Sequence, residues 1–202
     1  VNVLANFDPK VPENFKNPDV LVLVNLDPKV QLSIVSQFDK KPNFIMLDTM
    51  NFWMDHSLDN LIKIISKVDL ICINDEEVIQ LSGCLNHELG IKKILTMGPK
   101  YLIMKKGEYG ATLYSDESEF FCPSFKVKKV VDPTGAGDSF AGAFAGYLAE
   151  SKNYTFESIS SALIYANAVA SFCVEKFGIE NMLHIPKDEI DKRISFIKKH
   201  NN

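Results

Sequence analysis

The sequence predicts an α/β protein, a three-layer α/β/α domain built on a mostly parallel central sheet. Compact runs of aliphatic residues recur along the chain, for example at 19–25 and 44–47, and are typical of strands buried on both faces. Between them lie segments whose apolar residues repeat at helical spacing, as at 58–68. Strand–helix alternation of this kind favours a parallel sheet that is covered by helices on both faces.

The first half of the chain alternates strand and helix. The run 19–25 ends at a turn around Pro28, and a helix is expected from about 29 to 38. The strand at 44–47 is closed by Asp48, and the next helix spans 58–68. A third strand at 70–73 precedes two more expected helices. The first has an acidic first turn, which suits the helix dipole. These helices cover residues 75–81 and 89–97.

The second half continues this pattern around a Gly-rich turn at 132–138. Because ligands of parallel sheets bind outside the carboxyl ends of the strands, the polar residues that follow strands are candidates for a site. They are Asn25, Asp48, Asn74 and Lys105. The expected strands are 101–104, 111–114, and the shorter, more exposed 120–121 and 125–131. The expected helices are 139–150, 156–177 and 187–199.

Composition narrows the class of protein. The chain has 202 residues, is 46% hydrophobic and 24% charged, and carries a net charge of -4, so no global basic field predicts a nucleic-acid partner. No apolar run reaches the length of a membrane span, and the four histidines form no metal-ligand cluster. The four cysteines form no Cys-x-x-Cys pair, which indicates reduced thiols and a cytoplasmic protein. With no linker visible, residues 1–202 are expected to form one nucleotide-binding and catalytic domain.

The stretch from Asp132 to Asp138 carries the clearest chemistry. It reads Asp-Pro-Thr-Gly-Ala-Gly-Asp, follows apolar residues and leads directly into a helix. Backbone N–H groups at a helix start are unpaired and carry partial positive charge, and glycines allow an anion to approach them closely. The carboxylate of Asp138 in that cradle suggests phosphoryl transfer to a hydroxyl, with Asp138 taking the proton. The alternative is a structural turn with a helix cap.

Two further clusters fit the same reaction, each with a structural alternative. Asn74 and Glu77 follow a buried strand and could position Mg²⁺ and its waters, or could simply begin a helix. Residues 105–110 form a strand–turn–strand that could contact nucleotide phosphates, or an exposed hairpin. Residues 48–51 form either an Asx-type turn or part of a site, and Asn167 is a polar residue on an apolar helix. The sequence contains no Walker A motif and no Gly-x-Gly-x-x-Gly.

At residues 132–140 the pattern resembles the C-terminal signature of the ribokinase-like carbohydrate kinases, the PfkB family. Other segments resemble that family in the same order and extend the resemblance over essentially the whole chain. They are Asn74–Glu77 (Asn-x-x-Glu), 105–110 (the nucleotide-side strand and turn), 48–51 (Asp-x-x-Asn), Asn167 and Gly178.

The resemblance implies roles for individual residues. Asp138 is the implied catalytic base, and Gly135, Ala136 and Gly137, with the Asp138 N–H, form the implied anion hole. Asn74 and Glu77 are implied to organise Mg²⁺. The residues implied to line the ATP site are Lys105, Gly107, Gly110 and Asn167. A monovalent cation, such as K⁺, is implied near Asp132.

The sequence departs from the family at its front. The Gly-Gly substrate motif and the small β-sheet lid, through which the family often dimerises, are not visible. Val1 to Leu4 reads as a strand already under way, so we expect the chain to be the C-terminal two-thirds of a longer kinase. We therefore expect little sugar kinase activity from these residues alone.

The sequence favours an ATP-dependent kinase that phosphorylates a hydroxymethyl group of a sugar. A nucleoside such as adenosine is the alternative acceptor, because the family uses one catalytic set for both. A non-catalytic nucleotide-binding remnant is a different reading, and the retention of Asp138 argues against it. A dinucleotide oxidoreductase has no motif to support it.

Overall fold

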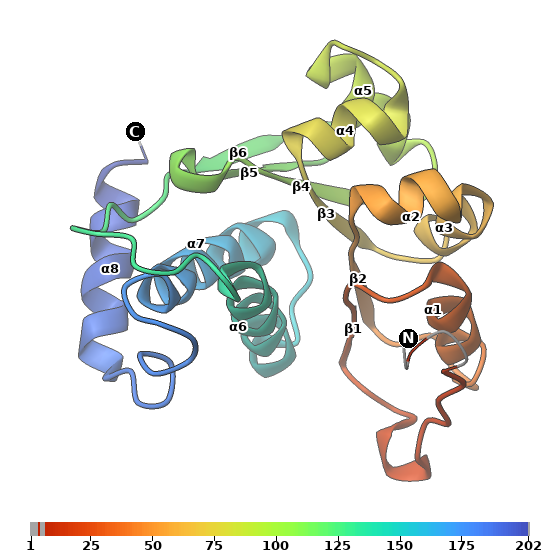
Figure 1. The fold of residues 1–202 in the computed structure, drawn as a ribbon, viewed down its shortest axis with the longest axis horizontal. Helices are drawn as coiled ribbons and strands as arrows, with labels where there is room; N and C mark the ends of the chain where they lie inside the picture. Colours follow the sequence, from red (N-terminus) through yellow and green to blue (C-terminus); the bar gives the residue numbers. More distant parts are fainter. Residues whose placement is uncertain (1–3, 5–6, 202) are drawn as a thin grey trace. The chain divides into compact units, whose positions relative to one another are not determined.

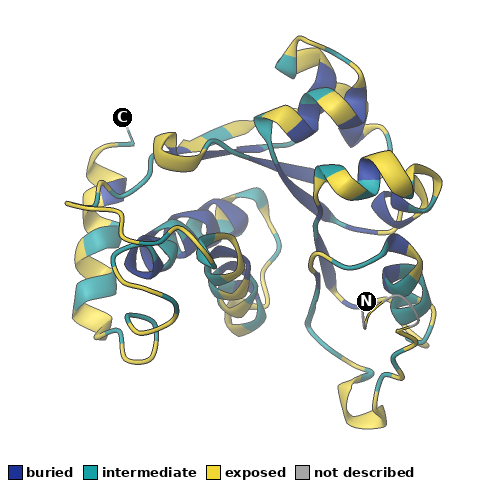
Figure 2. Ribbon diagram, in the orientation of Figure 1, coloured by how far each residue is buried: buried dark blue, intermediate teal, exposed yellow. Residues whose placement is uncertain are grey.

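The computed structural model describes residue 4 and residues 7–201 (Figure 1). Of the strand expected at the start of the chain, residues 1–3 lie outside the described residues, and Leu4 lies in a turn. The chain divides into two compact units, residues 1–102 and residues 103–202. Each unit has buried apolar residues of its own, which are dark blue in Figure 2.

Within the described residues, a mixed sheet of six strands has the order β1-β2-β3-β4-β5-β6. The first three strands are parallel, with Val20 opposite Phe44 and Met46 opposite Leu70, whereas β5 and β6 are antiparallel. This mixed sheet with its flanking helices confirms the predicted α/β class. The strands are β1 (Val20–Leu23), β2 (Phe44–Asp48), β3 (Leu70–Asn74), β4 (Tyr101–Lys105), β5 (Ala111–Tyr114) and β6 (Glu119–Cys122).

Unit 1 packs its helices around parallel strands. Helix α3 packs against α1 and α2, and α4 packs against β3 and α5. The side chains of Ile45, Leu61 and Ile71 are fully buried in this core. The helical elements are η1 (Glu13–Phe15), α1 (Pro28–Val35), α2 (Asn51–His56), α3 (Leu58–Ile65), α4 (Asp75–Ser82) and α5 (His87–Leu95).

Unit 2 is organised around α7, which packs against α6, α8, β5 and β6. Its core includes Phe144, Leu148 and Leu163, none of which is exposed to solvent. A one-turn helix follows β4 and precedes β5. The helical elements are η2 (Gly107–Tyr109), α6 (Ala136–Ser151), α7 (Phe156–Cys173) and α8 (Lys187–Lys199).

The structure departs from the sequence prediction in several further places. The helix predicted at 156–177 ends at Cys173. Helix α2 was not predicted, because its six residues are too few to show a clear apolar repeat. The strand predicted at 125–131 is wrong, since these residues form no helix or strand. Their alternating lysines and apolar residues imitate a strand, but Phe125 packs edge-on against Phe196 of α8 instead, with ring centroids 5.2 Å apart.

The helices and the cysteines of the described residues bear on membrane insertion and on disulfide formation. In residues 4 and 7–201, no helix has both the length and the apolar character that crossing a bilayer requires. Cys72, Cys84, Cys122 and Cys173 are all free thiols, and only Cys84 is not fully buried.

Candidate active site

The turn before α6 is built around Asp132. Its Oδ1 atom accepts a hydrogen bond from the Thr134 N–H (2.9 Å), and its Oδ2 atom accepts one from the Gly178 N–H (3.5 Å). The hydrogen bonds from Thr134, and more weakly from Gly178, lower the pKa of Asp132 below its ordinary value. Behind the turn, the Cys173 thiol donates to the Thr134 carbonyl (3.5 Å). The turn is therefore fixed by an ionised carboxylate and by the end of α7.

Helix α6 starts without a side-chain cap. Its N-cap is Gly135, which has a φ of 81°, a left-handed conformation that favours glycine. The Ala136 N–H is turned back to the Pro133 carbonyl (3.2 Å), and Ser139 donates to the Gly135 carbonyl (2.8 Å) to begin the helical ladder. The N–H groups of Gly137 and Asp138 lie between these two hydrogen bonds. They are the groups best placed to receive an anion.

The Asp138 side chain lies in the first turn of α6 and is exposed. A Cβ atom added at Gly137 would meet no atom within 4 Å, so the space beside the helix start is open. Of the four residues predicted to act on the phosphoryl group, Gly137 and Asp138 therefore lie at an open helix terminus. Gly135 provides the left-handed turn, and the Ala136 N–H is used within that turn. Their catalytic roles remain predictions.

A cavity of about 630 Å³ lies within unit 2, a size typical of small-molecule sites. We call it the unit 2 cavity. It is mostly apolar and takes its walls from the turn after β4, the loop after β6, the start of α6 and one face of α7. The residues that line it are Gly107, Glu108, Ser124, Phe125, Lys126, Val127, Val130, Pro133, Ala136, Asn167, Ala170, Ser171 and Val174.

The cavity brings together residues that the sequence singled out from distant segments. Gly107, Ala136 and Asn167 all line it, whereas Lys105 and Gly110, also predicted at the nucleotide site, are not among its lining residues. Lys105 is half-buried at the end of β4. Asn167 donates from its side-chain amide to the Cys122 sulfur (3.1 Å), and burial raises the pKa of Cys122 to about 11. The thiol behind Asn167 is therefore neutral at physiological pH.

Gly110 has a structural reason to be glycine. Its φ is 108°, and a Cβ atom there would lie 2.1 Å from the Cys122 carbonyl oxygen and 2.9 Å from the Pro123 Cα. The glycine lets the start of β5 pass close to the end of β6. Its effect on the nucleotide site is therefore indirect, since it sets where the loop after β6 begins.

Asn74 and Glu77 form a capping box at the start of α4. Asn74 Oδ1 accepts from the Glu77 N–H (2.7 Å), and Glu77 Oε2 accepts from the Asn74 N–H (2.8 Å). Glu77 is only 5% exposed, so the box holds its carboxylate in a fixed position. Both residues belong to unit 1.

This pair fits Mg²⁺ held through water rather than in a protein cage. Among the residues that the structure describes, no group of three or more His, Cys, Asp or Glu side chains could hold a metal ion. Mg²⁺ needs no such group, since it commonly keeps several waters and binds one or two carboxylates beside phosphate oxygens. A carboxylate has about four acceptor positions. The capping box and a hydrogen bond to a metal-bound water are therefore compatible at Glu77.

The residues that sequence reasoning missed lie mainly in loops. Phe125 and Val127 line the cavity from a segment that was predicted to be a strand, and Ser124 lines it from the position just before that segment. Ala170 on α7 and Val174, the C-cap of that helix, follow Asn167 at the helical spacing of three to four residues. That spacing could have identified the α7 residues once Asn167 was chosen. Residues 48–51 end β2 and begin α2, and Thr49 is buried.

Comparison with known proteins shows the family to which the chain belongs. Residues 13–186 match the pfkB family carbohydrate kinases. A nucleoside kinase of Methanocaldococcus jannaschii is 29% identical over 94% of this chain and 58% of its own length. A Bacillus subtilis ribokinase is 37% identical over 54% of this chain and 34% of its own length.

Solved structures agree. A ribokinase II candidate of E. coli, in its apo form, is 27% identical and superposes with a TM-score of 0.76 over 92% of this chain and 62% of its own. The same protein in complex with ATP and Mg²⁺ is 26% identical, with a TM-score of 0.68 over 85% and 58%. The chain thus spans between a third and two-thirds of the length of these relatives. Since the family match covers most of the chain, it belongs to the pfkB family carbohydrate kinases.

Proposed function

We propose that this chain carries the nucleotide site and the catalytic base of an ATP-dependent kinase that phosphorylates a hydroxymethyl group of a sugar. The observation that carries the proposal is the start of α6. There an uncapped helix terminus, the exposed Asp138 carboxylate and the end of the unit 2 cavity at Ala136 belong to one turn of the chain. Phosphoryl transfer needs such an arrangement, because it depends on positioning and on stabilising charge.

In this mechanism Asp138 accepts the proton of the attacking hydroxyl, so that the oxygen can bond to the γ-phosphorus as the bond to the leaving diphosphate breaks. The N–H groups of Gly137 and Asp138, with the glycine turn at Gly135, receive the negative charge of the migrating group. The apolar unit 2 cavity holds the nucleotide between Gly107 and Asn167. Lys105 and Gly110 act from the strand and turn beside it.

Mg²⁺ supplies charge neutralisation to the phosphate oxygens when it is bound. Asn74 and Glu77 would hold it through water. The E. coli structure that contains ATP and Mg²⁺ supports both cofactors. We also propose, from the family resemblance, a K⁺ requirement at the turn of Asp132, a homodimer formed through a lid, and a cytoplasmic location suited to four free thiols.

The test is an ADP-release assay of the complete kinase with ribose, fructose, 2-keto-3-deoxygluconate and adenosine. Asp138→Asn should lower kcat by about three orders of magnitude or more and leave ATP affinity nearly unchanged. Asp188→Asn is the matched control, because Asp188 is an exposed carboxylate in the first turn of a different helix, α8. Full activity of Asp138→Asn would refute the assignment of the base.

A nucleoside acceptor is the second candidate. It is favoured by the M. jannaschii nucleoside kinase, whose match extends over 94% of this chain. The same assay distinguishes the two, since the true acceptor class should show the higher kcat/KM by at least about tenfold. A preference for adenosine over all three sugars would replace the sugar proposal without changing the role of Asp138.

A further inference from the structure

The loop after β6 forms one wall of the unit 2 cavity, and few backbone hydrogen bonds hold it there. Residues 123–130 form neither helix nor strand, yet Ser124, Phe125, Val127 and Val130 line the cavity. In the described part of the chain, the loop's backbone hydrogen bonds to α7 lie at its far end, from Val131 (2.8 Å) and Asp132 (3.4 Å) to the Val174 carbonyl. Side chains must therefore hold the nearer part of the loop in place.

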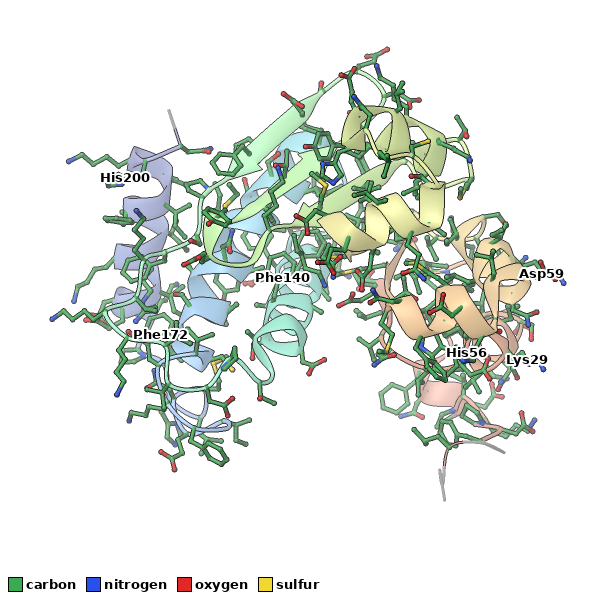
Figure 3. All side chains as sticks on the ribbon, turned by 45° about the horizontal axis from the view of Figure 1, so that its top comes forward. Lys29, His56, Asp59, Phe140, Phe172 and His200 are labelled. Atoms are coloured by element: carbon green, nitrogen blue, oxygen red, sulfur yellow. The ribbon has the colours of Figure 1, made fainter. Side chains whose placement is uncertain are left out.

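At the start of the loop, the Ser124 hydroxyl donates to the Glu108 carbonyl. The side chain that holds Phe125, the next residue, comes from α8. The Arg193 guanidinium stacks on the Phe172 ring, with its Cζ atom 3.4 Å from the ring centroid, and lies over the Phe125 ring at 4.5 Å. Phe172 is labelled on α7 in Figure 3. Phe196, one turn further along α8, packs edge-on against Phe125. Phe125 is therefore held by two residues of α8.

Arg193 also fixes the opposite wall. Its Nη1 atom donates to the Ser171 hydroxyl (2.7 Å), and its Nη2 atom forms an ion pair with Glu175. The side chain of Arg193 is only 11% exposed, and it is absent from the residues that line the cavity. It thus reaches the cavity only through Phe125, on the loop, and Ser171, on α7.

We propose that Arg193 is a positioning residue for the nucleotide, which holds the Phe125 wall against the α7 wall and keeps the unit 2 cavity preformed. This inference rests on the proposed function, because it takes the cavity to be the nucleotide site. Binding to a preformed cavity avoids the entropy cost of ordering a loop. Only an arginine can do this, since lysine keeps the charge but has neither a planar face nor a forked set of donors.

The experiment measures binding of a fluorescent ATP analogue, mant-ATP, to the purified complete kinase, in wild type, Arg193→Lys and Phe125→Leu. Both variants should weaken binding by about threefold to tenfold. The double variant should be weakened by much less than the product of the two effects, because both changes disrupt one contact. In the complete kinase, Arg193→Lys should raise KM for ATP and leave kcat and KM for the acceptor unchanged.

The control is Lys192→Ala. Lys192 is the neighbouring residue on α8, but its side chain is 64% exposed and forms ion pairs with Asp188 and Glu189 on the same helix. The Lys192→Ala variant should bind mant-ATP with the same affinity as wild type. A lower melting temperature of Arg193→Lys with unchanged affinity, or independent effects of the two variants, would overturn the positioning role. If wild type itself binds no nucleotide, the proposed function fails instead.

Discussion

The ionisation of Cys122 is coupled to folding. Burial raises its pKa from 9.0 to about 11, with a smaller opposing effect of the hydrogen bond from Asn167. Because the folded state holds the proton more tightly, the contribution of Cys122 to stability is complete below about pH 9 and is lost as the pH rises toward 11. Between pH 8 and pH 10, wild type should lose on the order of 1 kcal/mol more unfolding free energy than Cys122→Ser.

Urea denaturation at the two pH values measures this difference. Cys84→Ser is the control, since it removes a thiol that is only half-buried and leaves Cys122 in place. It should retain the wild-type dependence on pH. Equal losses in wild type and Cys122→Ser would show that folding does not change the pKa of this thiol.

Gly110 offers a second test at the scale of one residue. Gly110→Ala combines a positive φ with a Cβ placed 2.1 Å from a backbone oxygen, so it should lower the free energy of unfolding by more than about 2 kcal/mol. Gly142→Ala lies within α6 with open space around it, and should raise stability by up to about 1 kcal/mol. The urea midpoint of each variant is the measurement. A tolerated alanine at 110 would contradict the close approach of β5 and β6.

At the scale of elements, two substitutions of Asn74 measure how much the capping box stabilises α4. Asn74→Ala removes the Oδ1 acceptor of the Glu77 N–H and should destabilise the protein by about 1 kcal/mol, whereas Asn74→Asp keeps that acceptor and should not. Thermal denaturation of both variants measures the difference. A stable Asn74→Ala would mean that the cap contributes nothing.

Glu77→Gln extends this test to the metal. Glutamine can still accept the hydrogen bond of the Asn74 N–H, so the fold should be unaffected. Loss of the negative charge should raise the Mg²⁺ concentration that gives half-maximal activity of the complete kinase by several-fold. The readout is a Mg²⁺ titration at saturating ATP. An unchanged requirement would leave Glu77 with the capping role alone.

The elements also show how far sequence can lead. Aliphatic runs identified β1 to β4, and the signal is strongest in β2, β3 and β4, which are buried along nearly their whole length. Strand β5 was identified from the glycine-containing turn before it. The loop at 125–131 was mistaken for a strand, since its pattern is local while its true partners, Arg193 and Phe196, lie about seventy residues away. The signature at 132–138 could be identified from sequence because it is one continuous stretch. The cavity walls could not, because they come from segments that are far apart in the chain.

At the scale of the whole chain, the two compact units should respond differently to nucleotide. Because the unit 2 cavity belongs entirely to residues 103–202, a non-hydrolysable ATP analogue should slow amide exchange mainly there, in the loop after β6 and along α7. Hydrogen exchange with mass spectrometry measures this by peptide. The peptides of α1 and α3 serve as internal controls, and protection confined to residues 1–102 would contradict the location of the site.

The missing side-chain cap at the N-terminus of α6 has a consequence for the stability of that helix. Helices α1, α4, α5 and α7 are each capped by a side chain, from Asp27, Asn74, Asn86 and Thr155, whereas α2, α3 and α8, like α6, start without one. A side-chain cap typically takes the N–H of the second or third helical residue, which in α6 are those of Gly137 and Asp138, and contributes about 1 kcal/mol. Gly135 forgoes that stabilisation. In the proposed reaction the phosphoryl group takes the place of that cap, so the first turn of α6 should be more stable with substrate bound than without it.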